Sequence, residues 1–327
     1  MTEPSLTLAD LRLLAAAGGA APSLHNSQPW RFRATPDRRG LEVYVDTARA
    51  VPVADPDGRA RYISVGAALF NLRAAAAHLG RGAVVRLLPD ADRPDLAAVL
   101  DLPGRSHPWV PDLYAAIPHR HSSRRPFSNR DVPEAVLGEL AEAARREGTQ
   151  LTALEEGEVR RVLALTAEAE LRIAGDLARQ AEARDWVRLE APATDGIPAE
   201  ALGPVDHDAR VPMRSFTGPA PERPSEHFEP LPQLCTLATH LDRPQDWLRA
   251  GQALERIWLL ATVRGVRASV LHQAVEFPDT RRLLRDPAEG PGHVQLVLRF
   301  GYGPPGTPSP RRHPAEILDP GEEPAGE

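Results

Sequence analysis

One loop near the N-terminus decides how the rest of the chain is organised: Ala21-Pro22-Ser23-Leu24-His25-Asn26-Ser27-Gln28-Pro29-Trp30. It follows an apolar run that predicts a helix over residues 7–18, and two runs typical of strands come after it. The two prolines fix the backbone angle φ, and each removes an amide donor. The neutral side chains between them, which both donate and accept hydrogen bonds, are Ser23, Asn26, Ser27 and Gln28. This chemistry suits a planar heterocycle without formal charge, and the alternative is an ordinary polar turn that ends at a core tryptophan.

The remaining hydrophobic pattern predicts alternating helices and strands. Before Pro118, a helix is expected over 65–79, and strands are expected at 30–33, 41–45, 83–88 and 96–102. After Pro118, helices are expected from 133, over 156–189 and over 246–263, and strands at 151–154, 234–238 and 293–300. Prolines cluster at 191–232 and after 304, so these segments are expected to be loops or covering segments.

Two of the expected helices match each other. The pattern Gly-x-Ala-Leu occurs at 66–69 and again at 251–254, and the spacing to a later glycine, Gly80 or Gly265, is identical. Each of these later glycines stands where a helix C-cap is expected. Because helices and strands recur in the same order on both sides of Pro118, we infer a fused duplication of residues 1–118 and 119–327. Chance similarity between two alanine-rich helices is the alternative.

The composition excludes several classes of function. The chain has 327 residues, of which 42% are hydrophobic and 26% charged, as in ordinary globular proteins. A net charge of −6 points to neither nucleic acid nor an anionic membrane as a partner. The absence of lysine excludes Schiff-base chemistry, and the single cysteine, Cys235, excludes intrachain disulfides, iron–sulfur clusters and cysteine zinc sites. The first residues predict neither a signal peptide nor a membrane span, so a cytoplasmic location is expected.

The loop at 21–30 resembles the flavin-ring loop of the FMN-dependent nitroreductase family through its pattern Pro-Ser-x-x-Asn-x-Gln-Pro-Trp. The fuller pattern Ala-Pro-Ser-x-His-Asn-x-Gln-Pro-Trp is similar to the Acg branch of that family. The resemblance implies an α+β, nitroreductase-like fold of two fused repeats, which form a pseudo-dimer around one FMN site. It also implies that a single chain can act as a monomer. The FMN contacts that it implies in this loop are Pro22, Ser23, Asn26 and Gln28.

A second stretch, Arg120-His121-Ser122-Ser123-Arg124, resembles the Arg-x-Ser-x-Arg signature of nitroreductase domains. The resemblance makes Arg120, Ser122 and Arg124 candidates for contacts with the FMN phosphate and ribityl chain. Arginine suits a phosphate because its planar fork donates two hydrogen bonds at once. A solvated basic turn is the alternative.

Two further cofactor contacts are implied by position alone. The family places basic phosphate contacts after its final strand, where this chain has Arg311 and Arg312, and the choice between them stays open. Near flavin N5 the family often has Glu-Gly, whereas this chain has His272-Gln273, so Gln273 is a candidate contact. A lone histidine such as His272 is more often structural than catalytic.

Each half carries one of the two motifs and lacks the other. The first half has the ring loop without an Arg-x-Ser-x-Arg start, and in the second half residues 145–150 replace the ring loop. One complete FMN site per chain is therefore expected, with the mirror-image site empty. The proline-rich segment 191–232 corresponds to a region that is thought to act as a lid over the flavin in the Acg branch.

The resemblance implies an oxidoreductase in which NADPH or NADH reduces FMN and the flavin then reduces a nitro or quinone compound. FMN N5 carries the chemistry, so no catalytic protein residue is expected. Two alternatives remain: a protein that sequesters FMN under a lid that prevents turnover, and a degenerate fold that binds no flavin. No metal site is expected, because His119 and His121 stand close together without partners at zinc spacing.

Overall fold

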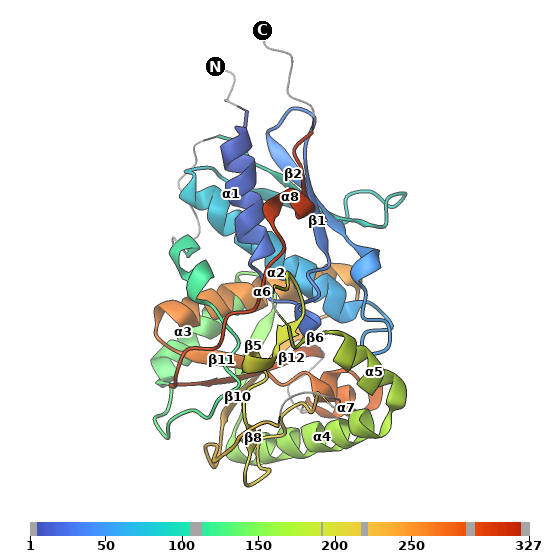
Figure 1. Cartoon of the computed structure of the whole chain (residues 1–327). Helices are drawn as coiled ribbons and strands as arrows, with labels where there is room; N and C mark the ends of the chain where they lie inside the picture. The colour runs from blue at the N-terminus through green and yellow to red at the C-terminus, as the bar shows by residue number, and fades with distance from the viewer. Residues whose placement is uncertain (1–4, 105–112, 191, 217–221, 286–291, 322–327) are drawn as a thin grey trace.

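The computed structural model describes residues 5–104, 113–190, 192–216, 222–285 and 292–321. They form an α+β structure with two larger sheets and two short strand pairs, which confirms the fold class expected from the sequence (Figure 1). The first half contains α1 (Leu8–Gly19), β1 (Trp30–Ala34), β2 (Gly40–Val45), α2 (Arg59–His78), β3 (Val84–Leu87) and β4 (Leu96–Asp101). The short 3-10 helices η1 (Leu24–Asn26) and η3 (Tyr114–His119) lie in the loop at 21–30 and at the junction between the halves.

The second half is larger and less regular. Its main elements are α3 (Glu134–Arg145), β5 (Gln150–Ala153), α4 (Glu156–Gly175), α5 (Leu177–Asp185), β10 (Gln233–Thr239), α6 (Pro244–Val263), β11 (Arg267–Val270), α7 (Pro278–Leu283) and β12 (His293–Gly301). Between α5 and β10 lie four two-residue strands, β6 (Val187–Arg188), β7 (Ile197–Pro198), β8 (Val205–Asp206) and β9 (Ser225–Glu226). The described chain closes with α8 (Pro314–Ile317) and β13 (Leu318–Asp319). Among the described residues, no helix is long and apolar enough to cross a lipid bilayer.

The first sheet has the strand order β13-β1-β2-β4-β3. β1 alternates buried and exposed residues, so that Trp30, Phe32 and Ala34 face the core. β13 comes from the far end of the chain and pairs with β1 in parallel, with Phe32 opposite Leu318. Figure 1 shows α8 (dark red) beside α1 and β1 (blue). The end of the described chain therefore covers a sheet edge that would otherwise expose unpaired amides.

The second sheet has the order β11-β12-β10-β5, and each neighbouring pair is antiparallel. On one face of β12, Leu296, Leu298 and Phe300 pack into a core with α3 and α6. β11 is a strand that the sequence analysis did not predict. It has only four residues, between a turn at Gly265 and a 3-10 turn, and so short a run does not show a clear period of two.

Two helix boundaries differ from the expected ones. α2 begins at Arg59 rather than near residue 65, because the Asp55 carboxylate accepts two amides of its first turn at 2.9 and 2.8 Å. The single helix expected over 156–189 is divided into α4 and α5 at Asp176. The Asp176 side chain accepts two amides of α5 at 2.9 and 3.2 Å, and this cap starts a new helix in a different direction.

The two halves meet where α2 crosses α6, in the most extensive helix–helix contact of the described residues. Gly66 in α2 and Gly251 in α6 face each other at the crossing. A Cβ atom on Gly66 would overlap the Leu248 carbonyl oxygen, and one on Gly251 would overlap the Ile63 carbonyl oxygen. The backbones approach this closely because neither glycine carries a side chain. These are the first glycines of the two matched helical patterns, so the matched positions lie against each other.

We expect Gly251→Ala to lower the free energy of unfolding by about 1–3 kcal/mol, because the added methyl group must push α2 and α6 apart. The matched control is Gly138→Ala in α3, where an added Cβ meets no atom within 4 Å. That control should raise stability by about 0.5–1 kcal/mol, since alanine is the better helix former. Urea denaturation measures both changes. Equal stability of Gly251→Ala and the wild type would contradict the need for a close crossing.

Candidate functional site

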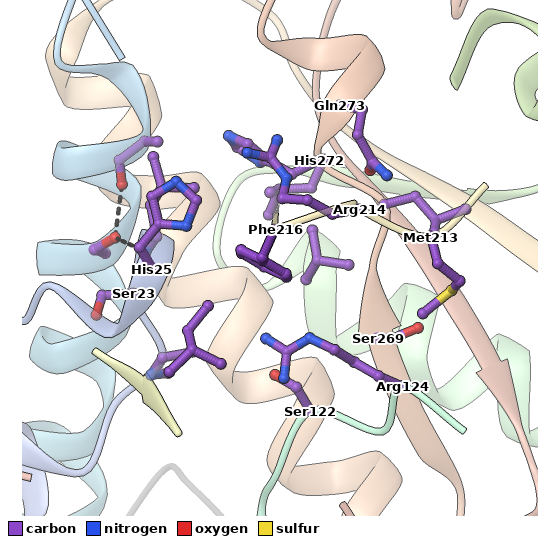
Figure 2. Close-up of a pocket in the computed structure, with 18 of the residues that line it drawn as sticks. Ser23, His25, Ser122, Arg124, Met213, Arg214, Phe216, Ser269, His272 and Gln273 are labelled. Atoms are coloured by element: carbon purple, nitrogen blue, oxygen red, sulfur yellow. Dashed lines mark hydrogen bonds between the residues drawn. The ribbon is translucent and has the colours of Figure 1, made fainter. Parts of the chain in front are cut away.

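A pocket lies where η1, the α2–α6 crossing and β11 meet. It encloses about 1030 Å³ of space, a value that includes its open mouth. Its walls come from segments far apart in the sequence. The polar and charged lining residues drawn in Figure 2 include Ser23, His25, Ser122, Arg124, Arg214, Ser269, His272 and Gln273.

One side of this pocket is formed by residues 192–216 and 222–232, which we call the covering segment. Its lining residues are Ile197, Leu202, Pro212, Met213, Arg214, Phe216 and Arg223. Arg223 holds the segment together, because its guanidinium donates to four backbone carbonyls of the segment at 2.7 to 2.9 Å. The Gln273 amide donates to the Pro212 carbonyl at 3.1 Å and so links the segment to the turn after β11.

The Arg-x-Ser-x-Arg stretch runs beside β11. Ser122 forms an isolated parallel bridge with Ala268, and the Ser123 amide donates to the Ala268 carbonyl at 2.9 Å. Alternate side chains of an extended segment point to the same side. Ser122 and Arg124 both line the pocket as a result.

Arg124 is a half-buried cation without an acidic partner among the described residues. It donates to the Ala201 carbonyl at 2.8 Å. Burial lowers the pKa of Arg124 to about 10, and the positive charges of Arg223 and Arg214 act in the same direction. Of these neighbours, Arg214 is neutralised by an ion pair with Glu276. Positive charge in a buried place is costly unless an anion neutralises it, so the pocket favours a ligand that carries negative charge.

The pocket also offers uncharged polar groups. The Ser269 hydroxyl is buried and has no hydrogen-bond partner among the described residues. Burial, together with nearby arginines, holds the pKa of His25 and that of His272 well below the usual range, so both imidazoles are neutral at pH 7. His25 lies edge-on to Phe216 of the covering segment, with ring centroids 6.1 Å apart. Each neutral imidazole has one donor and one acceptor for a ligand.

The loop at 21–30 has an unusual backbone. His25, Asn26 and Gln28 have φ angles of 52°, 56° and 53°, in the left-handed region that L-residues rarely adopt. The Ser23 hydroxyl accepts a hydrogen bond from the Gln28 backbone amide at 2.9 Å, and this bond closes the loop on itself. This conformation brings Pro22, Ser23 and His25 to the pocket wall.

Asn26 and Gln28 do not line the pocket but join three parts of the chain. The Asn26 amide donates to the Gly196 and Pro310 carbonyls at 2.8 and 2.9 Å. The Gln28 side-chain NH₂ group donates to the Thr194 carbonyl at 2.9 Å, and the Gln28 side-chain oxygen accepts a hydrogen bond from the Arg312 backbone amide at 2.9 Å. Through these bonds the loop holds the start of the covering segment and the C-terminal segment.

Arg120 and Arg311 form a second cluster of buried positive charge. Both guanidinium groups donate to the Ala20 carbonyl at 3.2 Å. Arg120 Nε lies 3.3 Å from Glu255 Oε1, and the Arg120 guanidinium lies 4.9 Å from the ring centre of Trp258, which lines the pocket. Burial lowers the pKa of Arg311 to about 9, and burial raises the pKa of the Glu255 carboxyl to about 7.

Arg312 has different surroundings from Arg311. Its guanidinium donates to the Glu316 carbonyl at 2.9 Å and lies 3.8 Å from an Asp46 carboxylate oxygen. Arg311 instead donates to the Asn26 side-chain oxygen at 2.8 Å and shares the Ala20 carbonyl with Arg120.

The structure thus divides the residues that the sequence analysis assigned to FMN. Those that line the pocket are Pro22, Ser23, Ser122, Arg124 and Gln273. Those that lie outside its lining are Asn26, Gln28, Arg120, Arg311 and Arg312. The assignment of all of them to FMN stays a prediction. Sequence reasoning did not single out Ser269, Met213 or Arg223, because only the folding of the covering segment over β11 brings them together.

We expect the stability of the wild type relative to Glu255→Gln to fall as the pH rises from about 5 to about 8. The pKa of Glu255 is about 7 in the folded protein, against an ordinary value of 4.5. The folded state therefore holds a proton that the unfolded state loses, and this stabilisation, complete below about pH 4.5, is lost as the pH passes about 7. The full change is at most about 3 kcal/mol. Urea denaturation of both proteins across this range measures it, and parallel profiles would contradict a raised pKa.

Comparison with known proteins gives relatives in Mycobacterium tuberculosis, although no protein-family model matches the chain. The chain is 33% identical over 315 residues to Rv3131, provisionally named an NAD(P)H nitroreductase, covering 91% of this chain and 88% of that protein. It is 27% identical over 309 residues to acg, provisionally named in the same way, covering 91% of this chain and 92% of that protein. The chain belongs to the nitroreductase family, and the similarity to acg confirms the branch expected from the loop at 21–30.

Solved structures of nitroreductases are more distant. The FMN- and NADPH-dependent nitroreductase NfnB of Sphingopyxis sp. strain HMH is 17% identical, with a TM-score of 0.41 over 64% of this chain and 99% of that one. A nitroreductase with bound FMN from Bacteroides fragilis is 14% identical, with a TM-score of 0.37 over 62% of this chain and 94% of that one. Similarities of this size do not support a conclusion about this chain.

Proposed function

We propose that the protein binds FMN and uses NADPH or NADH to reduce a nitro or quinone compound by two electrons. The provisional names of the two relatives support this reaction class. The observation that carries the proposal is the half-buried Arg124, which has no acidic partner among the described residues and lines the same pocket as the Ser269 hydroxyl, a buried group without a hydrogen-bond partner. Such a pocket suits a flat ligand with apolar faces, polar edges and negative charge, and FMN has these properties.

The FMN phosphate is assigned to Arg120 and Arg311. Both lie in one cluster, and the Arg311 Nε donor has no hydrogen-bond partner among the described residues, whereas Arg120 Nε lies 3.3 Å from Glu255 Oε1. A phosphate dianion would offset the positive charge that Glu255 alone leaves in the cluster. Arg312 suits this role less well, because Asp46 and Glu316 already lie near its guanidinium. Of Arg311 and Arg312, between which the sequence does not decide, we therefore assign Arg311 to the FMN phosphate.

The remaining parts of FMN are assigned to groups of the pocket wall. The hydroxyls of Ser23 and Ser122 suit the ribityl chain, and Arg124, Ser269 and Gln273 suit the polar edge of the ring. Pro22 supplies an apolar wall, while Asn26 and Gln28 keep the loop in shape through their bonds to other segments.

FMN, when bound, supplies the chemistry by taking a hydride from the nicotinamide and passing two electrons to the substrate. The protein chain binds FMN and the substrate, orients them, and shields them from water. A cationic Arg124 at the ring edge would favour the more negative reduced state of the cofactor. His25 and His272 are neutral at pH 7, so each can donate a hydrogen bond to an oxygen of an uncharged substrate. Apolar lining such as Phe216 and Leu254 keeps water away.

The pseudo-dimer is also part of the proposal. Residues 1–118 and 119–327 would be fused repeats that build one FMN site inside one chain, so that a monomer suffices and the mirror-image site is empty. Two observations support it. The matched glycines Gly66 and Gly251 lie against each other, and the pocket combines Ser23 from the first half with Arg124 from the second.

A second candidate function, retention of FMN without turnover, is favoured by the covering segment. Met213, Arg214 and Phe216 of this segment line the pocket, and its Asp195 pairs with Arg49 and Arg188. A segment held in this way limits the access of a nicotinamide. Steady-state oxidation of NADPH with menadione or nitrofurazone separates the two functions: turnover supports the oxidoreductase, and its absence in flavin-loaded protein supports retention.

Arg311→Ala is expected to weaken FMN binding by roughly 10- to 150-fold, because a charge-assisted hydrogen bond contributes about 1.5–3 kcal/mol. Arg312→Ala is the matched control and should leave the affinity close to that of the wild type. Fluorescence titration of the apoprotein with FMN measures the affinity, and denaturant unfolding without FMN reports any general damage. Equal affinities of Arg311→Ala and the wild type would remove Arg311 from the site.

Arg223→Gln is expected to speed the oxidation of reduced FMN by menadione if the covering segment limits access. The substitution leaves several of the four carbonyls that Arg223 holds without a donor, so the segment opens more often. Stopped-flow absorbance of the flavin measures the rate, with Glu222→Gln, at an exposed position of the same segment, as the control. Identical rates in all three proteins would show that the segment does not control access.

A further inference from the structure

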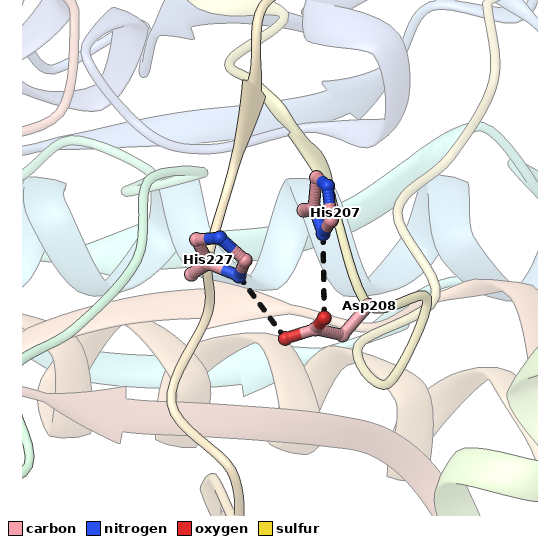
Figure 3. Close-up of side chains that lie close together, drawn as sticks. All are labelled: His207, Asp208 and His227. Atoms are coloured by element: carbon pink, nitrogen blue, oxygen red, sulfur yellow. Dashed lines mark hydrogen bonds and ion pairs between the residues drawn. The ribbon is translucent and has the colours of Figure 1, made fainter.

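A cluster of potential metal ligands lies outside the pocket, where β8 and β9 end. β8 and β9 run in parallel, with Asp206 opposite Glu226, and the His207 amide donates to the Glu226 carbonyl at 2.8 Å. The residues that follow the two strands, His207 and His227, therefore stand side by side (Figure 3). With Asp208 they form the one group of three in the described chain whose His, Cys, Asp or Glu ligand atoms lie close enough for one ion.

The spacing of these three side chains is close to that of a metal site. His207 Nδ1 lies 3.3 Å from one carboxylate oxygen of Asp208, and His227 Nδ1 lies 3.2 Å from the other. The three potential ligand atoms all lie within 4.8 Å of one another. In a tetrahedral zinc site with bonds of about 2.0–2.2 Å, ligand atoms are roughly 3.3–3.6 Å apart. The two short distances end on different oxygens of Asp208, so small rotations of the exposed side chains are needed to bring one oxygen and the two nitrogens into this range.

We propose that His207, Asp208 and His227 bind a zinc ion. Two imidazole nitrogens and one carboxylate oxygen are ligands that zinc accepts readily, whereas magnesium and calcium prefer oxygen ligands alone. All three residues are exposed, so water can take the fourth position. The sequence analysis did not consider this group, because one ligand lies far along the chain from the other two.

The turn that carries the ligands is organised before any ion binds. The Asp206 carboxylate accepts the backbone amides of Asp208, Arg210 and Val211 at 3.1, 2.8 and 2.9 Å. These bonds use the oxygens of Asp206 and fix the turn, so that Asp208 is the carboxylate left to face the two imidazoles. A preformed turn lowers the conformational entropy that metal binding must overcome.

One neighbour opposes the ion. Arg210 Nη1 lies 3.7 Å from the Asp208 carboxylate, where its positive charge would repel a divalent cation. The Arg210 side chain is 49% exposed, so it can turn away into water when the ion enters. The charge of Arg210 therefore weakens the site without blocking it, and removing that charge should strengthen zinc binding.

The position of the cluster gives the ion a structural consequence. β8 and β9 enclose the part of the covering segment that carries Arg214 and Phe216 to the pocket, and Arg223 stands just before β9. An ion held by His207 and Asp208, just after β8, and by His227, just after β9, ties the ends of the two strands together. Zinc would thereby hold the covering segment closed, with or without FMN.

The first experiment measures zinc binding to the tag-free, full-length apoprotein by competition with a chromophoric zinc chelator. We expect one zinc per chain, at least tenfold weaker binding in His227→Ala and Asp208→Asn, and no change in His240→Ala, an exposed histidine outside the cluster. Arg210→Gln should bind zinc several-fold more tightly than the wild type. Unchanged affinity in His227→Ala, or weaker binding in Arg210→Gln, would overturn the proposal.

The second experiment tests whether the ion ties the two strands, and it uses the apoprotein so that the result does not depend on FMN. Trypsin cleaves after arginine except before proline. It can therefore cut after Arg210 and Arg214 in the enclosed part of the covering segment, but not after Arg223, which precedes Pro224. Zinc should slow cleavage at these sites several-fold in the wild type and leave it unchanged in Asp208→Asn. Zinc binding without any protection from trypsin would overturn the tying role.

Discussion

The close crossing of α2 and α6 is the constraint on which the rest of the structure depends. It brings the two halves together over a contact in which Gly66 and Gly251 leave no room for a side chain. The same two helices supply Ile63, Leu254 and Trp258 to the pocket. A wider separation would move the walls of the pocket apart and separate the loop at 21–30 from the Arg-x-Ser-x-Arg stretch. The shape of the candidate site therefore follows from a packing requirement at two positions that carry no chemistry of their own.

The loop at 21–30 acts as the joint between three segments. Each of its left-handed residues destabilises the fold by about 1–3 kcal/mol, so the hydrogen bonds around the loop must stabilise this conformation by more than that. Asn26 and Gln28 provide these bonds by joining the start of the covering segment and the C-terminal segment to the first half. The bonds that keep the loop in shape thus also position the pieces that close the pocket.

Burial explains why arginine serves as the basic residue of this site. The pKa of Arg124 is lowered to about 10 and that of Arg311 to about 9, yet both side chains remain charged at neutral pH. A lysine begins from an ordinary pKa of about 10.4, so a shift of the same size would bring it close to neutrality. The arginines of these two clusters lie largely away from bulk water, so their charge can act on a ligand with little screening.

The sequence by itself determined the α+β class, most helices and strands, the family, and the two stretches that approach the pocket. Periodicity and the local pattern of Pro, Ser, Asn and Gln carry this information within a few residues of chain. Only the tertiary structure decided that Asn26 and Gln28 bond to other segments, that Ser269 and Arg223 belong to the pocket, and that His227 meets His207 and Asp208. Those arrangements depend on contacts between residues far apart in the chain, such as β13 on β1 or the covering segment on β11. Local propensity does not encode them, because their free energy arises only when the buried surfaces and unpaired polar groups of separate segments come together.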